Sequence, residues 1–199
     1  MIANARTRPS QLRSRERVTK ILDAAAEVMV ERGYDGATLR EIATRADVKQ
    51  TSMYRYWPNK QAIVSDLIDR FIAGQDVELD ACMAMRESGS SINEVLASYI
   101  SKLRHIVETE YWIRPCQIAL ISDPALKGLD EKMHAHFSDR FSSLFFTEAG
   151  DQSNHNTQTA SRLLVIFLDT FVLSLNRYAT LDHKAMEAEF RAVLQGLLP

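Results

Sequence analysis

The sequence predicts an all-α fold, and three observations support this. Apolar residues recur at spacings of three and four along most of the 199 residues, which is the periodicity of amphipathic helices. No stretch of useful length alternates apolar and polar residues, as a half-buried strand would. The chain has only 7 Gly and 5 Pro, whereas folds rich in strands and turns use more of both. The 46% hydrophobic and 25% charged fractions are typical of a soluble globular protein.

The first helix is expected over about residues 13–32. Its apolar stripe contains Val18, Ile21 and Leu22 and continues to Met29. Gly33 is expected to end it, because glycine tolerates the left-handed conformation found after many helices. Residues 1–12 have almost no apolar side chains but include Arg6 and Arg8, and we expect a flexible basic arm there.

Two short helices are expected next. Thr38 precedes Glu41 by three residues, a capping-box pattern that starts a helix ending near Asp47. Another begins at about residue 49 or 50 and reaches Tyr56. It stops there because Trp57 precedes a proline, and that position disfavours helix.

The remaining helices follow from capping residues and apolar stripes. Asn59 is expected to cap a fourth helix that continues through Ile72. Further helices are expected over about 91–109, 125–147, 158–179 and 183–198. Pro115 interrupts or starts a helix between these, and Pro124 suits the first position of another. Residues 148–157 are polar and contain a glycine, which indicates a loop.

The two short helices and the turn between them form a helix-turn-helix pattern. Ile42, Ala43, Val48 and Met53 would pack the helices together. The outer face of the second helix then presents side chains suited to a DNA major groove: Lys, Arg and Gln pair with base edges, and hydroxyl groups donate to phosphates. The candidate DNA contacts are Thr38, Arg40, Lys49, Gln50, Thr51, Ser52, Tyr54, Arg55 and Lys60.

The charge distribution favours the same interpretation. Residues 1–60 hold 12 Lys+Arg against 7 Asp+Glu, a net charge of +5, whereas residues 61–199 hold 12 against 19, a net charge of −7. A basic segment joined to an acidic one is typical of a protein that binds a polyanion through one part only. The alternative is a solvated basic face on a purely structural helical protein, which would bind DNA weakly, without sequence preference and without dimerising.

The segment from about 13 to 60 resembles the N-terminal domain of the TetR family of bacterial regulators. The resemblance is carried by Arg17 to Gly33 followed by Tyr34 and Thr38, by Leu39-Arg-Glu-Ile-Ala, and by Tyr54-Arg-Tyr-Trp-Pro-Asn-Lys60. The sequence departs from the family pattern at Asp47, where the turn usually has glycine. It departs again at Lys49, where a capping residue such as serine is common and lysine cannot cap. Asp tolerates the backbone of such a turn, and an uncapped Lys49 is more available to DNA.

The resemblance implies an N-terminal helix-turn-helix domain over 13–60, after the arm, and a larger helical domain for ligand binding and dimerisation over 61–199. It implies a cytoplasmic homodimer on a palindrome-like operator, released as a repressor when a small, mostly apolar effector binds. The candidate effector-pocket residues are Met85, His105, Tyr111, Trp112, Cys116, Gln117, Met133, Phe137, Phe141, Phe167 and Asp169. The last two helices would dimerise through Leu168, Val172, Leu175, Met186, Phe190, Val193, Leu194 and Leu197.

Other classes of function have less support. Ser52, His105, Cys116 and Asp169 could perform nucleophilic chemistry, but they lie in no local catalytic motif, so we expect no enzyme. The two cysteines and five histidines show no metal-ligand spacing, so no metal or other cofactor is expected, and no apolar run reaches the length of a membrane span. Asp169 interrupts an apolar helix; it either pairs with Arg177 or meets a cationic ligand. An activator or a nucleoid-type binder without ligand remains an alternative within the DNA-binding class.

Overall fold

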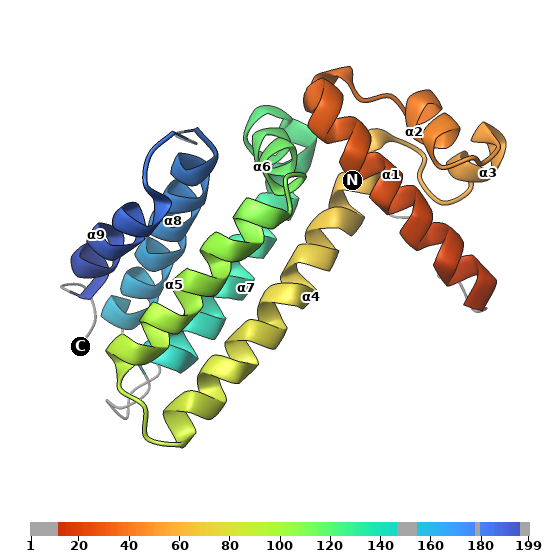
Figure 1. Cartoon of the computed structure of the whole chain (residues 1–199). Helices are drawn as coiled ribbons and strands as arrows, with labels where there is room; N and C mark the ends of the chain where they lie inside the picture. Colours follow the sequence, from red (N-terminus) through yellow and green to blue (C-terminus); the bar gives the residue numbers. More distant parts are fainter. Residues whose placement is uncertain (1–11, 147–154, 178–179, 196–199) are drawn as a thin grey trace. The chain divides into compact units, whose positions relative to one another are not determined.

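A computed structural model describes residues 12–146, 155–177 and 180–195, and these are almost entirely helical (Figure 1). The described residues contain no strand, which confirms the all-α prediction. The elements are α1 (Leu12–Gly36), α2 (Leu39–Arg45), α3 (Gln50–Tyr54), α4 (Lys60–Glu87), α5 (Ile92–Thr109), α6 (Ile113–Ser122), the 3-10 turn η1 (Pro124–Leu126), α7 (Lys127–Phe145), α8 (His155–Arg177) and α9 (His183–Gln195).

The ends of several helices are set by the residues expected to set them. The Asn59 side chain accepts a hydrogen bond from the backbone N–H of Ala62 at 2.9 Å, and Pro124 lies in the first turn of η1. Gly33 has the expected left-handed backbone (φ 71°), but a short helical turn follows it, so α1 is kinked there rather than ended. The predicted loop 148–157 was too long, because α8 already begins at His155. The expected arm falls almost wholly outside the described residues.

The chain forms two compact units. The N-terminal unit consists of the residues up to Phe71 together with Tyr111–Leu129, and the C-terminal unit consists of Ile72–Glu110 together with the residues from Asp130 onward. The helix α4 belongs partly to each. The segment with α6 and η1 groups with the N-terminal helices, because α6 packs against α1. This grouping differs from a simple cut at residue 60, which stays a prediction about function.

The N-terminal unit is built around buried side chains from α1 to α4. Ile21 and Met29 of α1 and Met53 of α3 are fully buried. Trp57, which follows α3, is also buried, and its indole N–H donates to the Asp66 carboxylate of α4 at 2.7 Å. This core fixes α2 and α3 against the longer helices.

The C-terminal unit has an aromatic core. Phe137, Phe141 and Phe145 follow one another along α7 with ring centroids 6.3 and 6.0 Å apart, and the Tyr99 ring of α5 meets Phe141 edge-on at 5.4 Å. The Tyr99 hydroxyl donates to the Gln75 side chain of α4 at 3.1 Å, which satisfies a buried polar group. The helix α5 also packs against α8 and α9.

Candidate nucleic-acid interface

The start of α2 is fixed by a side-chain cap. The Thr38 hydroxyl accepts from the backbone N–H of Glu41 at 3.2 Å and donates to the Glu41 carboxylate at 3.0 Å. These two bonds confirm that the Thr38–Glu41 pattern begins the helix, and such a cap is worth about 1 kcal/mol. Because its hydroxyl is engaged in this way, Thr38 positions the helix whether or not it also meets DNA.

The turn between α2 and α3 depends on Asp47. Asp47 is the one residue other than glycine with a positive φ among those described (51°). Backbone hydrogen bonds close the turn, from Asp47 N to Thr44 O at 3.2 Å and from Val48 N to Ala43 O at 3.0 Å. Aspartate can occupy this conformation because its short polar side chain tolerates the left-handed region. This confirms the prediction that Asp47 can take the place of the usual glycine in the turn.

The helix α3 presents polar side chains on one face and Met53 to the core on the other. Lys49 at its N-cap makes no side-chain capping bond, as expected. Lys49, Gln50, Thr51 and Arg55 are exposed, Tyr54 is 50% exposed, and Ser52 is partly covered. The Gln50 amide donates to the Tyr54 hydroxyl at 3.3 Å, so these two side chains lie together on the outer face. The face therefore carries donors and acceptors of the kind that read base edges.

Two basic side chains of the N-terminal unit are directed inward or toward carboxylates. The Lys60 ammonium donates to the Tyr34 carbonyl at 2.6 Å and lies 4.0 Å from the centroid of the Tyr34 ring. Arg45 pairs with Glu31 at 2.7 Å and with Glu27 at 3.1 Å, which raises the pKa of the guanidinium. Lys60 thus joins α4 to the end of α1, and its expected phosphate contact stays a proposal.

The sequence profile described as "Bacterial regulatory proteins, tetR family" matches residues 21–67, which is the segment just described. The N-terminal segment of the chain is therefore similar to the TetR family. This match confirms the resemblance of the segment, and the relatives that it shares are described as transcriptional regulators.

Three relatives show how far the likeness extends. It is 28% identical over 122 residues to an uncharacterized regulator, YdeS of Bacillus subtilis, spanning 61% of this chain and 54% of that protein. It is 35% identical over 66 residues to the repressor KstR of Mycobacterium tuberculosis, spanning 33% and 30%. It is 26% identical over 204 residues to the activator FasR of Mycolicibacterium smegmatis, spanning 98% and 89%. The chain thus spans about half of YdeS and a third of KstR.

Solved structures extend the likeness of fold to nearly the whole chain. A transcriptional regulator from Rhodococcus sp. Rha1 has a TM-score of 0.72 at 17% identity, with 90% of this chain and 95% of that chain covered. FadR of Bacillus subtilis, solved in complex with stearoyl-CoA, has a TM-score of 0.69 at 19% identity, with 88% and 96% covered. At these identities the likeness shows the fold alone.

The candidate effector residues do not form one set. Trp112 and Cys116 are buried in the N-terminal unit, where Gln117 is partly buried and Tyr111 is 67% exposed. The others lie in the C-terminal unit, where Met133, Phe137 and Phe141 are buried, Met85 and Phe167 are partly buried, and His105 is exposed. Burial raises the pKa of the Cys116 thiol to about 12, so it is protonated at neutral pH and unsuited to nucleophilic chemistry.

Asp169 has a partner that the sequence did not indicate. Its carboxylate lies 2.5 Å from Nε2 of His134 on α7, and this hydrogen bond raises the pKa of His134. The sequence suggested Arg177 on the same helix as a partner, whereas the contact seen for Asp169 joins α8 to α7.

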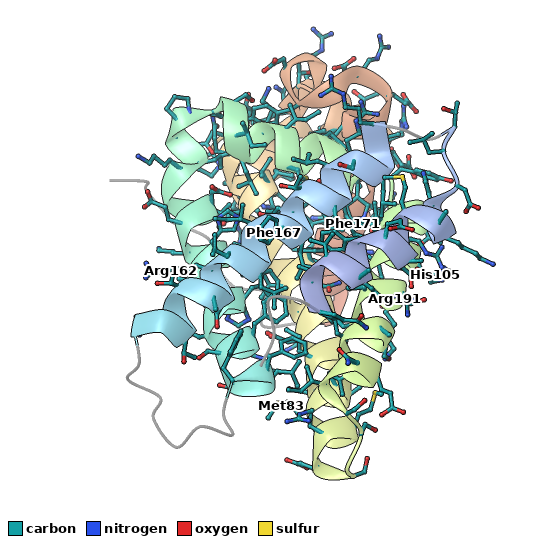
Figure 2. The ribbon with its side chains drawn as sticks, turned by 90° about the vertical axis from the view of Figure 1, so that its left-hand side faces the viewer. Met83, His105, Arg162, Phe167, Phe171 and Arg191 are labelled. Carbon is teal, nitrogen blue, oxygen red and sulfur yellow. The ribbon has the colours of Figure 1, made fainter. Side chains whose placement is uncertain are left out.

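Part of the expected dimer surface is already used inside the chain. Leu168, Val172 and Leu175 of α8 and Leu194 of α9 are buried, so they belong to the core of one chain, and this corrects the prediction. Phe190 stacks on Phe171 with centroids 4.4 Å apart (Figure 2 labels Phe171), and Met186 is partly buried. Val193 is 62% exposed, and Leu197 lies outside the described residues.

Two apolar side chains on α8 that were not among the predicted interface residues are exposed. Leu163 is 43% exposed and Ile166 is 52% exposed. The stretch Thr157–Leu175 is long and apolar enough to cross a membrane by length and composition, with a mean hydropathy of 1.4, yet only 39% of it is buried. The core helix of a soluble protein can have the same length and composition. The finding therefore indicates an apolar helix of which one face is not covered by the rest of the described chain.

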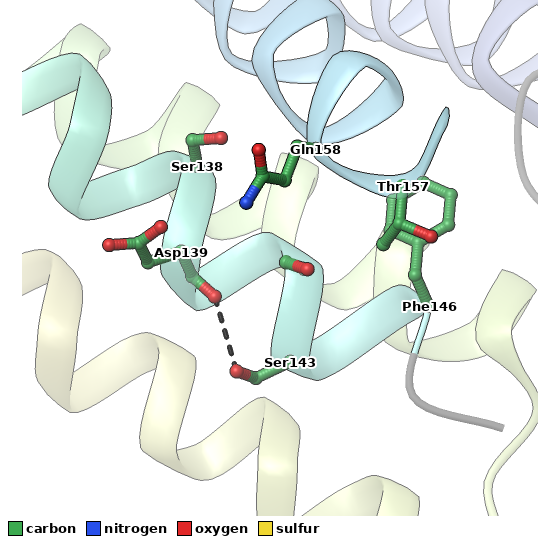
Figure 3. A pocket seen from close by; sticks show the side chains of 7 residues that line it. Ser138, Asp139, Ser143, Phe146, Thr157 and Gln158 are labelled. Atoms are coloured by element: carbon green, nitrogen blue, oxygen red, sulfur yellow. Dashed lines mark hydrogen bonds between the residues drawn. The ribbon is translucent and has the colours of Figure 1, made fainter. Parts of the chain in front are cut away.

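A small hollow between α7 and α8 was also not foreseen (Figure 3). It has a volume of about 220 Å³ and a lining rich in hydroxyl groups, with Phe146 beside them. The Ser143 hydroxyl donates to the backbone carbonyl of Asp139 at 3.1 Å within it. Within the described parts of the chain, no group of three His, Cys, Asp or Glu side chains gathers as a metal site.

Proposed function

We propose that this chain is a DNA-binding transcriptional repressor of the TetR type that a small, mostly apolar effector releases from its operator. The outward face of α3 supports the DNA-binding part most directly: it exposes Gln50, Thr51 and Tyr54 while Met53 holds the helix to the core. The net charge of +5 over residues 1–60 supplies the electrostatic attraction.

The test of DNA binding uses fluorescence anisotropy with a labelled duplex from upstream of the gene and a scrambled duplex as the control. Gln50→Ala and Thr51→Ala should reduce the difference between the two duplexes, because they remove contacts to base edges. Tyr54→Phe should weaken both duplexes alike, because it removes a phosphate contact. Equal losses on both duplexes for Gln50→Ala would refute its role in reading bases.

The effector part rests on the aromatic core of the C-terminal unit and on the relatives. Phe137 and Phe141 give the unit an apolar interior suited to an apolar ligand, and FadR of Bacillus subtilis was solved in complex with stearoyl-CoA. Adding stearoyl-CoA to the protein–DNA complex, with free coenzyme A as the control, tests an acyl chain as the recognised group. Release by the acyl compound alone supports a repressor of this type, whereas tighter binding would favour an activator, as FasR is described.

The proposed assembly is a cytoplasmic homodimer through the uncovered face of α8 and α9. Leu163, Ile166 and Val193 expose apolar surface there, and burying it against a second copy would be favourable. Sedimentation at micromolar concentration should show a dimer, and Ile166→Glu should shift it toward monomer. Leu181→Glu is the matched control, because Leu181 is equally exposed (52%) but lies between the two helices. A monomeric wild-type protein would refute the dimer.

A further inference from the structure

Asp123 joins three segments of the N-terminal unit that are far apart in sequence. One of its oxygens, Oδ2, accepts from the Tyr34 hydroxyl at 2.6 Å and from the Gln61 amide at 2.8 Å. Its other oxygen, Oδ1, accepts from the backbone N–H of Ala125 at 2.9 Å and so caps η1. These donors, the Tyr34 hydroxyl above all, hold the pKa of Asp123 below its usual value.

Two of these segments are the two ends of the helix-turn-helix. Tyr34 lies at the end of α1, just before α2, and Gln61 lies in the first turn of α4, just after α3. Lys60 adds a second tie between the same ends, through the Tyr34 carbonyl and ring. The segment 35–59, which contains the proposed base contacts Gln50 and Thr51, is therefore a loop whose two ends are joined by contacts among Tyr34, Lys60, Gln61 and Asp123. We call this set of contacts the clasp.

The charge of Asp123 makes this role testable. A carboxylate in a basic unit repels phosphate, so by electrostatics alone its loss should tighten DNA binding. If the carboxylate fixes the angle at which α2 and α3 stand on α1 and α4, its loss should instead weaken specific binding, because base contacts require a fixed orientation. The two roles predict opposite signs.

We propose that Asp123 is a positioning residue for DNA recognition, and that the α6–η1 junction is thereby a working part of the DNA-binding unit. This rests on the proposed DNA-binding function. Asp123 does not contact DNA in this role. It acts through Tyr34 and Gln61 on the orientation of α3.

The experiment compares Asp123→Asn with Asp35→Asn. Asparagine at 123 keeps one oxygen to cap η1, but its amide nitrogen cannot accept from Tyr34 and Gln61. Asp35→Asn makes the same change of charge at an exposed position beside Tyr34 and leaves the clasp intact. Affinities for the duplex from upstream of the gene are measured over a range of salt concentrations. Backbone hydrogen exchange is followed in the full chain without DNA.

We expect Asp123→Asn to lower specific affinity roughly tenfold, which corresponds to ~1.4 kcal/mol. Its salt dependence should match that of the wild type, because no phosphate contact is lost. Asp35→Asn should bind as well as the wild type or slightly better. Tyr34→Phe should reproduce the loss, and adding it to Asp123→Asn should cost little more, because both remove the same bond. Exchange within residues 34–60 should be faster in Asp123→Asn and unchanged in Asp35→Asn.

Asp123→Asn binding as tightly as the wild type, or more tightly, would overturn the proposal, and so would unchanged exchange in residues 34–60. A wild-type protein that prefers no duplex would instead refute the proposed function. Hydrogen exchange would still decide whether Asp123 holds the clasp.

Discussion

The two units of the chain differ in where their tryptophans and histidines lie. Both tryptophans, Trp57 and Trp112, belong to the N-terminal unit, whereas all five histidines belong to the C-terminal unit. Three of those histidines contact carboxylates between helices: His134 meets Asp169, His136 meets Asp76 and His183 meets Glu108. Permanent charges join helices in both units, as in the Arg45 pairs with Glu27 and Glu31 and the Arg104 pair with Glu187, so the histidine contacts are what distinguishes the C-terminal unit.

This difference in histidine content predicts that the two units respond differently to pH. Arginine and lysine keep their charge throughout the neutral range, so the proposed attraction of the N-terminal unit for DNA should be constant there. Histidine changes charge in that range, so the packing of the C-terminal unit can respond to pH. Tryptophan fluorescence reports on the N-terminal unit alone, which allows the two to be followed separately.

The largest expected effect concerns the aromatic core of the C-terminal unit. Phe141→Ala should lower the free energy of unfolding by about 3–5 kcal/mol, because Phe141 is 1% exposed and packs between Phe137, Phe145 and Tyr99. Thermal unfolding followed by circular dichroism should show a transition at a lower temperature than in the wild type. Tryptophan fluorescence should shift much less if the units unfold separately, whereas equal shifts of both probes would show a single cooperative transition.

The turn of the helix-turn-helix gives the next effect. Asp47→Ala should destabilise the N-terminal unit by about 1–2 kcal/mol, because alanine tolerates a φ of 51° poorly. Asp47→Gly is the matched variant and should cost little or nothing, since glycine occupies this region freely. The midpoint of the fluorescence transition measures both. If both variants lose the same stability, the Asp47 side chain rather than the backbone would be the important feature.

The sequence predicted the N-terminal unit in more detail than the C-terminal unit, and the reason is local. The Thr38 cap, the left-handed Asp47 and the uncapped Lys49 depend on residues within a few positions, so their spacing alone reveals them. Asp169 pairs with His134 over 35 residues, and Tyr34 with Asp123 over 89, and no local pattern encodes such contacts.

The absence of long-range information in a local pattern also explains why the sequence did not indicate which apolar residues of α8 are exposed. The apolar stripes of α8 and α9 were visible in the sequence, but a stripe does not say which side faces its own chain. Leu168 turned out to face inward, whereas Leu163 and Ile166 face outward. The α6–η1 segment was assigned with the C-terminal residues because nothing in its composition indicates that it packs on α1.

A smaller effect should separate stability from recognition within the N-terminal unit. Lys49→Ser would supply the missing cap of α3, which should stabilise the unit by about 0.5–1 kcal/mol. The same change removes an exposed positive charge beside Gln50, so DNA affinity should fall and the salt dependence should become shallower. Lys49→Ala, which gives neither cap nor charge, is the control. Unchanged affinity in both variants would exclude Lys49 as a DNA contact.

The smallest effect tests whether pH acts on the C-terminal unit. The Asp169 contact raises the pKa of His134, so this pair should stabilise the folded chain fully below the unfolded value of about 6.5, and the gain should disappear as pH rises through the folded pKa. Asp130, the other carboxylate near His134, has its pKa raised by burial; its effect has the same sign but falls in the acid range.

His134→Gln keeps a donor for Asp169 but cannot titrate. The difference in unfolding free energy between wild type and variant should therefore shrink from pH 6 to pH 8. It should stay below about 1 kcal/mol, because both partners are about a third exposed. The pairs of His136 and His183 are present in both proteins and cancel in the difference. The change should appear in circular dichroism and not in tryptophan fluorescence. A fluorescence transition that follows pH in the same way would mean that the two units share one folding equilibrium, so that ionisation in the histidine-bearing unit also reaches the DNA-reading one.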